Sequence, residues 1–183
     1  MERQQSQQER SLAWFKIADL IARGEREKAL SVFRLLSHSL SDPAYVLQLE
    51  GDILWHMDDK NAIDKYRQAA FLYHKEKRLV DAAAIYEHLL ALEPDSYDHL
   101  SVIFVFYTML DWPERFMSCY QRLAELFKAG RIDEFQLEKA MRDVFEVANP
   151  EDKKHKKTWF FVWFKDTLST LPEGLAARLQ GLL

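Results

Sequence analysis

A pattern of small and aromatic residues between positions 66 and 94 limits the folds open to this chain. The pattern reads Tyr66-x2-Ala69-Ala70-x2-Tyr73-x8-Ala82-x3-Tyr86-x2-Leu89-x4-Pro94. The alanines would lie on the facing sides of two consecutive helices, where small side chains let the helix axes approach closely. The tyrosines would fill the space beside them, and the proline would end the second helix. We therefore predict a helix–turn–helix unit of about 34 residues.

A second pattern recurs after an offset of 33, from position 14 to position 47. The first copy is Trp14-x2-Ile17-Ala18-x2-Ile21-x7-Ala29-x3-Phe33-x2-Leu36, and the second is Leu47-x2-Glu50-Gly51-x2-Leu54-x7-Ala62-x3-Tyr66-x2-Ala69. The helix expected over 61–75 closes the second copy and also opens the unit that ends at Pro94. The pairing of the later helices therefore stays open.

Together these patterns resemble the tetratricopeptide repeat (TPR) family. The motif covers about residues 11–96, whereas residues 97–148 match only in helix length and apolar stripe. Two departures are an interhelix gap one residue short in both copies and Glu50 at an apolar position. The resemblance implies a right-handed TPR-like α–α superhelix of stacked helix pairs, an architecture that typically holds another protein chain.

Composition supports an all-α domain, because the chain of 183 residues is 48% hydrophobic and has only five Gly and five Pro. We expect a disordered tail over 1–10, a TPR-like repeat domain over 11–148, a charged linker over 149–157, and a C-terminal aromatic helix and cap over 158–183. The predicted helices cover about 11–23, 25–38, 44–58, 61–75, 79–92, 96–110, 113–129, 133–148 and 158–171, with a short one after Pro172.

The helix expected over 96–110 is apolar on nearly every side, which predicts that it is buried, preferably under the chain's own C-terminal helices. The aromatic helix after Lys157 follows a lysine-rich stretch. We favour a capping role for this aromatic helix. The alternatives are a second interface for a partner or for self-association, through Trp159, Phe160, Trp163 and Phe164, and contact with a membrane surface.

The TPR resemblance also implies a partner-binding groove lined by the first helix of each repeat. Carried over by position, the groove residues are Phe15, Asp19, Arg23, Tyr45, Gln48, Asp52, Trp55 and His56, with Leu12 and Ala22 beside them. Phe15 and Asp19 stand where groove members that bind heat-shock chaperone tails carry Lys and Asn, so we do not expect that activity. The alternative is that later helices cover this face. We expect Asp52→Lys to abolish peptide capture without unfolding the chain.

Other classes of function have little support in the sequence. The net charge of −4 leaves no basic footprint for nucleic acid. The six histidines are scattered, Cys119 is the lone cysteine, and no HExxH, GxxxxGK[ST] or GxSxG motif occurs, so we predict no enzyme, cofactor or metal site. No segment is long enough for a membrane span, and the first ten residues are not a signal peptide. We expect a reduced, cytoplasmic protein.

The expected function is a non-enzymatic protein–protein interaction module, an adaptor or scaffold that binds a peptide or helix of a partner protein in its groove. The alternatives are a small TPR-type secretion chaperone that shields hydrophobic segments of cargo, or a structural subunit of a larger assembly.

Overall fold

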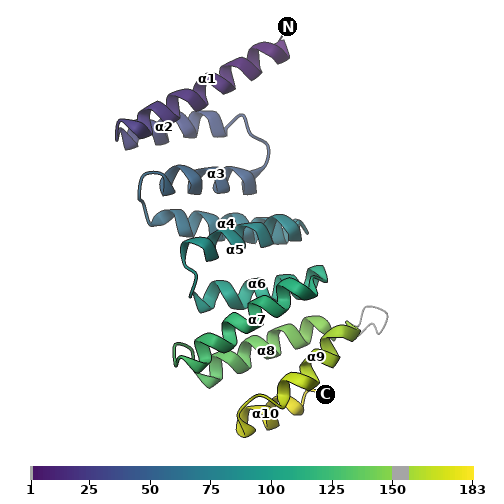
Figure 1. Ribbon diagram of the computed structural model, residues 1–183. Helices are drawn as coiled ribbons and strands as arrows, with labels where there is room; N and C mark the ends of the chain where they lie inside the picture. The colour runs from purple at the N-terminus through teal and green to yellow at the C-terminus, as the bar shows by residue number, and fades with distance from the viewer. Residues whose placement is uncertain (1, 150–156) are drawn as a thin grey trace. The chain divides into compact units, whose positions relative to one another are not determined.

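The computed structural model describes residues 2–149 and 157–183, with side chains from Leu12 onward, and all its regular elements are helices (Figure 1). The helices are α1 (Glu2–Ala22), α2 (Arg26–Ser37), α3 (Pro43–Trp55), α4 (Asn61–Lys75), α5 (Leu79–Leu92), α6 (Tyr97–Leu110), α7 (Pro113–Lys128), α8 (Glu134–Ala148), α9 (Thr158–Leu168) and α10 (Glu173–Gln180). The prediction of an all-α fold is confirmed for these residues.

Helix boundaries agree best with prediction where the sequence carries strong capping signals. α4 and α5 have the predicted bounds, and α8 begins after Asp133, whose side chain accepts from the Gln136 N–H at 2.7 Å in a capping box. α6 begins after Ser96, whose hydroxyl accepts from the His99 N–H. These local hydrogen bonds satisfy backbone donors that the first helical turn leaves open.

Three predicted boundaries differ from the structure by three or more residues. α1 begins at Glu2 and so includes residues expected in a disordered tail, which are rich in the good helix formers Gln, Glu and Arg. α3 ends at Trp55 because Asp58 adopts a left-handed backbone, with φ of 53°. α9 ends at Leu168, where the Thr170 hydroxyl donates to a backbone carbonyl shortly before Pro172. Most of the expected charged linker (150–156) lies outside the described residues.

The chain divides into two compact units, Met1–Ile85 and Tyr86–Leu183. The boundary falls inside the segment expected to form one repeat domain. In the first unit α1 pairs with α2, and α3 pairs with α4, as the two copies at an offset of 33 predict. Ile17 of α1, Phe33 and Leu36 of α2, and Ile53 of α3 form one buried cluster. The two helix pairs therefore share a hydrophobic core.

Close packing of α3 on α4 depends on small residues. Ala62, Ala69 and Ala70 of α4 are fully buried. The ring of Tyr66, also buried, lies against the backbone of Gly51: a β-carbon built on Gly51 would lie 2.8 Å from Tyr66 Cε1. The small-residue pattern thus marks positions where the two helices leave no room for a larger side chain.

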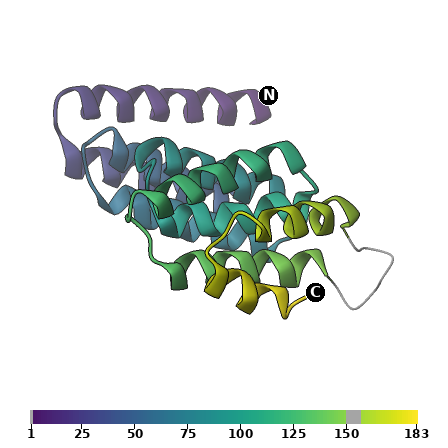
Figure 2. The same ribbon diagram turned by 60° about the horizontal axis from the view of Figure 1, so that its bottom comes forward.

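The core of the second unit is formed by α6, α7 and α8, with residues of α9 and α10 packed into it. Phe104 of α6 stacks on Phe116 of α7 with ring centroids 4.3 Å apart, and the Trp163 ring of α9 meets Phe104 edge-on. α10 packs on α8, and α9 and α10 lie beside α8 in both ribbon views (Figures 1 and 2). The apolar helix α6 is therefore covered by helices of its own chain.

The aromatic residues of α9 point mostly into this core. Phe160 and Phe164 are fully buried, and Trp163 is almost fully buried. The rings of Phe164 and of Phe145 in α8 pack together, with their centroids 5.2 Å apart. Trp159, which is partly buried, donates from its indole Nε1 to Asp111 Oδ1 at 2.7 Å. The second interface expected at these four residues is therefore not a free surface in this structure, because intramolecular packing already uses most of it.

The contact between α9 and Asp111 predicts that the stability of the fold depends on pH. The hydrogen bond from Trp159, together with the Lys157 ammonium 3.3 Å away, lowers the pKa of the Asp111 carboxyl below its usual value. A lowered folded-state pKa stabilises the fold above the unfolded pKa of about 4, and that stabilisation is lost as the pH falls through the folded pKa. We expect Asp111→Asn to lower the urea midpoint at pH 7, and the difference from wild type to shrink below about pH 4.

The control for this series is Asp166→Asn on the exposed side of α9, which should leave the midpoint unchanged across the same pH range. A difference between wild type and Asp111→Asn that stays constant from pH 7 to strongly acidic pH would show that the carboxylate charge contributes nothing to this contact.

Candidate functional site

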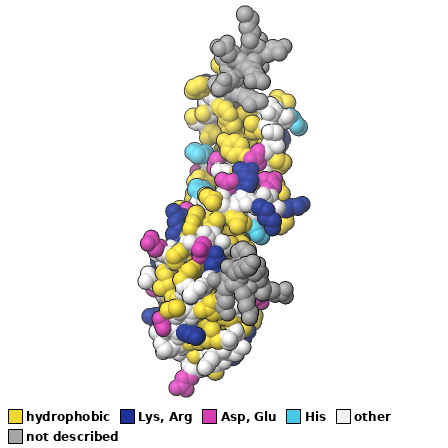
Figure 3. Space-filling model, turned by 90° about the vertical axis from the view of Figure 1, so that its right-hand side faces the viewer, with side chains coloured by type: hydrophobic (Ala, Val, Ile, Leu, Met, Phe, Trp, Pro, Cys, Tyr) yellow, Lys and Arg dark blue, Asp and Glu magenta, His cyan; other side chains and the backbone are white. Residues whose placement is uncertain are grey.

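The first unit carries an outward surface on the first helix of each helix pair, which we call the first-helix face. Its members occupy matching positions on α1 and α3. They are Leu12, Phe15, Asp19 and Ala22 on α1 with Arg23 directly after it, and Tyr45, Gln48, Asp52 and Trp55 on α3 with His56 directly after it. Figure 3 shows that hydrophobic side chains reach the surface of this unit.

The aromatic residues of the first-helix face are exposed. The exposed fraction is 74% for Phe15, 43% for Tyr45 and 41% for Trp55. Large apolar side chains gain free energy when they leave water, by roughly 25 cal/mol for each Å² buried. These exposed aromatic residues of the first-helix face are therefore suited to contact another molecule.

The polar residues of the same face are already engaged within the chain. Asp19 forms an ion pair with Arg23 at 2.9 Å, and the Tyr73 hydroxyl donates to Gln48 Oε1 at 2.9 Å. The Tyr66 hydroxyl donates to Asp52 Oδ1 at 2.8 Å, and His56 Nδ1 lies 2.7 Å from the Asp52 carbonyl oxygen. Burial, reinforced by Asp52, raises the pKa of Tyr66, so its hydroxyl remains a donor at neutral pH.

This arrangement changes the expectation for Asp52→Lys. The substitution would remove the hydrogen bond between the Tyr66 hydroxyl and the Asp52 carboxylate and would place an ammonium beside a buried tyrosine. We therefore expect the substitution to destabilise the fold as well as to alter the surface, so it does not isolate binding. Substitutions at Phe15 and Trp55 are better tests.

A charged network missed by the sequence patterns holds the start of α3 in place. Asp42 caps α3 by accepting from the Tyr45 N–H at 3.0 Å, and Arg78 Nη1 lies 2.7 Å from Asp42 Oδ2. The Arg78 guanidinium also lies over the Tyr73 ring, 4.2 Å from its centroid. No local sequence signal pointed to an arginine so far along the chain.

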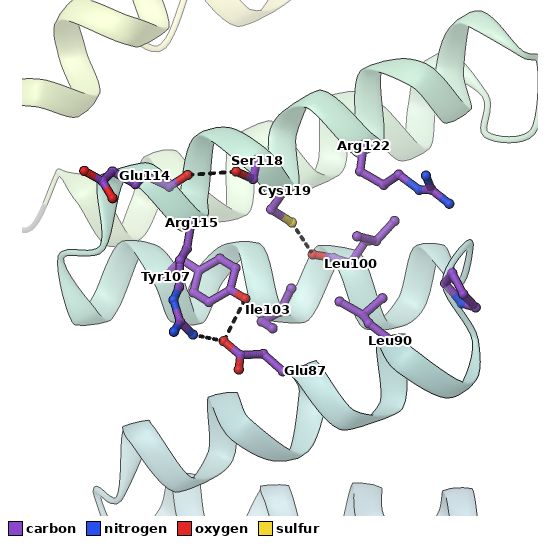
Figure 4. A pocket seen from close by; sticks show the side chains of 11 residues that line it. Glu87, Leu90, Leu100, Ile103, Tyr107, Glu114, Arg115, Ser118, Cys119 and Arg122 are labelled. Atoms are coloured by element: carbon purple, nitrogen blue, oxygen red, sulfur yellow. Dashed lines mark hydrogen bonds and ion pairs between the residues drawn. The ribbon is translucent and has the colours of Figure 1, made fainter.

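The second unit contains a groove of about 740 Å³ between α5, α6 and α7, which we call the α5–α7 groove (Figure 4). Leu90, Leu100, Ile103 and Cys119 give it apolar walls. Glu87 of α5 accepts from the Tyr107 hydroxyl of α6 at 3.0 Å and pairs with Arg115 of α7, as Figure 4 shows. The contact therefore joins three helices at one end of the groove.

The electrostatics of this groove give no sign of an activated nucleophile. Burial raises the pKa of Cys119 to about 12, and its thiol donates to the Leu100 carbonyl at 3.5 Å. The thiol is buried and therefore stays protonated at neutral pH. Arg115 is paired with Glu87, and Arg122 and Arg131 share Asp95, so both arginines that line the groove already have carboxylate partners. Such a groove can accommodate an apolar group.

Two further observations bear on the functional classes considered above. Within residues 2–149 and 157–183, no three His, Cys, Asp or Glu side chains gather as metal ligands would. Over the same ranges, no helix has the length and apolar character needed to cross a membrane.

Comparisons with known proteins return neither a matching family model nor a matching curated protein. The resemblance to tetratricopeptide repeats therefore depends on the residue patterns and the helix pairs described above.

Proposed function

We propose that this chain is a right-handed, TPR-like helical repeat protein that acts as a non-enzymatic interaction module, an adaptor or scaffold. Its partner is a peptide or helix of another protein, bound in a concave groove on the first-helix face. The observation that carries this proposal is the exposure of Phe15, Tyr45 and Trp55 on the first helices of two consecutive helix pairs. In repeat proteins, equivalent faces of successive units form extended binding surfaces.

The contacts within the chain suggest how such a surface would bind. The aromatic side chains would supply most of the buried apolar area, since each can bury roughly 150–250 Å². Gln48 and Asp52 are held in fixed orientations by Tyr73 and Tyr66, so any further hydrogen bond they accept costs little side-chain entropy. The face therefore combines apolar anchors with polar groups that are already positioned.

The proposal predicts that aromatic residues of the first-helix face dominate partner binding. We expect Phe15→Ala/Trp55→Ala to reduce retention of a partner in affinity capture by at least roughly tenfold, because aromatic anchors at interfaces are commonly worth 2 kcal/mol or more. Mass spectrometry of the retained proteins would identify the partner. The matched control is Leu35→Ala/Phe71→Ala, whose residues are 75% and 66% exposed but lie on the second helices α2 and α4.

Two results would count against the proposal. Equal retention by wild type and Phe15→Ala/Trp55→Ala would remove the first-helix face from consideration, and loss in the Leu35→Ala/Phe71→Ala control alone would move the binding surface to α2 and α4. The chaperone and structural-subunit alternatives gain no specific support, since the apolar helix α6 is packed inside the second unit.

A further inference from the structure

The two sequence copies differ in how the aspartate of the first-helix face is paired. Asp19 and Asp52 occupy matching positions at the offset of 33, and so do Arg23 and His56. In the first copy Arg23 Nε donates to Asp19 Oδ1 at 3.1 Å, and Arg23 Nη2 lies 2.9 Å from Asp19 Oδ2. The guanidinium therefore contacts both carboxylate oxygens. In the second copy a histidine stands at the arginine position, so Asp52 lacks the corresponding cation.

No other cation takes that place in the described part of the chain. Asp52 is half-buried, and its Oδ1 accepts from the neutral hydroxyl of Tyr66. Glu50, the other acidic residue of α3, is paired with Lys65 of α4 at 3.0 Å, whereas Asp52 forms no ion pair with any described residue. α3 itself contains no lysine or arginine. Because partial burial reduces screening by salt, an arriving cation would interact strongly with this carboxylate.

The position of Asp52 in its helix also favours a cation. Asp52 lies in the last turn of α3, where the helix dipole stabilises a positive charge and opposes a carboxylate, and this turn contains no basic residue. In the loop that follows, Asp59 is paired with Arg26, and Asp58 and Lys60 carry opposite charges. The loop therefore adds no net positive charge that would compensate Asp52.

An exposed indole ring lies beside this carboxylate. Trp55 follows Asp52 by three positions, so the two side chains are neighbours on the surface of α3. A guanidinium can pair with a carboxylate and stack on an aromatic ring at the same time, which an ammonium does less well. The chain makes this combination internally elsewhere: Arg115 is paired with Glu87, and its guanidinium lies over the Trp112 ring, 4.8 Å from the centroid.

We propose that the first-helix face recognises an arginine of its partner, whose guanidinium pairs with Asp52 and stacks on Trp55. This inference rests on the function proposed above and specifies a residue that the partner must supply. The partner's arginine would make with Asp52 the contact that Arg23 makes with Asp19. Tyr45 is exposed on the same face of α3, so we expect apolar residues beside the arginine in the bound segment.

Selection of random peptides displayed on phage against the full chain tests this inference. We expect the enriched peptides to share an arginine, and its replacement by the neutral analogue citrulline to raise the Kd roughly tenfold in fluorescence anisotropy, because the charge-assisted contact is lost. Asp52→Asn, whose amide oxygen can still accept from Tyr66, should raise the Kd of the arginine peptides by a similar factor and leave that of the citrulline peptides unchanged. Asp64→Asn removes an exposed carboxylate from α4 and is the control that should change neither Kd.

A second variant adds a cation instead of removing the carboxylate. His56→Arg would place a guanidinium four residues after Asp52, in the arrangement of Asp19 and Arg23, and would compete with the arginine of the peptide. We expect it to raise the Kd of the arginine peptides roughly tenfold, because the carboxylate would then be occupied. His56→Gln also loses the imidazole but adds no charge, so it should leave the Kd unchanged.

The outcomes separate this inference from the proposed function. Enriched peptides that share no arginine, or whose Kd is raised by Phe15→Ala/Trp55→Ala but not by Asp52→Asn and His56→Arg, would overturn the arginine contact and leave the first-helix face as the binding surface. Enriched peptides that bind equally well to wild type and to Phe15→Ala/Trp55→Ala would contradict both the proposed function and the inference, as would a selection that enriches no peptide.

Discussion

Phe160→Ala should lower the free energy of unfolding of the second unit by about 3–5 kcal/mol. The side chain is fully buried, and its ring lies 5.5 Å from Phe164, 5.9 Å from Phe116 and 6.0 Å from Phe145 between centroids. Alanine would remove these contacts and leave a cavity that α7, α8 and α9 cannot close without moving. Urea unfolding at pH 7, followed by near-ultraviolet circular dichroism of the tryptophans, measures the change.

Val162→Ala is the matched control for Phe160→Ala, because Val162 lies two residues away on the same helix but is 60% exposed. It should change the free energy of unfolding by less than about 0.5 kcal/mol. The comparison also separates core packing from an interface between chains. If Phe160→Ala left stability unchanged and instead weakened self-association in sedimentation experiments, the packing of α9 on its own chain would be contradicted.

Gly51→Ala should destabilise the first unit by about 1–3 kcal/mol, although alanine is intrinsically the better helix former by about 1 kcal/mol. The new methyl group would lie 2.8 Å from Tyr66 Cε1 and 2.9 Å from Cδ1. The ring cannot move away easily, because it is buried and its hydroxyl is bound to Asp52. Thermal unfolding of the purified chain measures the effect.

A double-mutant cycle makes the Gly51 prediction specific. In a Tyr66→Leu background the ring is absent, so Gly51→Ala should cost less there than in wild type. Gly174→Ala in α10 is the control: the nearest atom to its new β-carbon is Arg178 Nη1 at 3.6 Å, an ordinary contact, so this change should be neutral or stabilise by up to about 1 kcal/mol. Equal effects at Gly51 and Gly174 would contradict the close packing of α3 on α4.

The sequence predicted most of the local structure because its signals act over short distances. The capping box at Asp133, the serine before α6 and the proline after α5 each act within a few residues of a helix end. The offset of 33 likewise predicted the α1–α2 and α3–α4 pairs, since equivalent residues must meet equivalent neighbours in each pair.

The site was less predictable because its contacts join residues far apart in sequence. Glu87 and Arg115 are 28 positions apart, and Asp111 and Trp159 are 48 apart, so no local pattern links them. The resemblance to tetratricopeptide repeats placed Asp52 and Trp55 on one face of their helix, but it could not show which edge of that face meets α4. The structure shows that Asp52 lies at this edge and accepts from Tyr66, whereas Trp55 remains exposed.

Site-specific photo-crosslinking tests the first-helix face most directly. A photoreactive phenylalanine derivative would replace Phe15 or Trp55 in one set of variants and Leu35 or Phe71 in the other, at positions that are all exposed. We predict that the Phe15 and Trp55 variants crosslink to the same partner protein in lysate, at peptides close together in its sequence, and that the Leu35 and Phe71 variants do not. Crosslinks to one partner from Leu35 and Phe71, with none from Phe15 and Trp55, would contradict the proposal that the first helices of the repeats carry the binding surface.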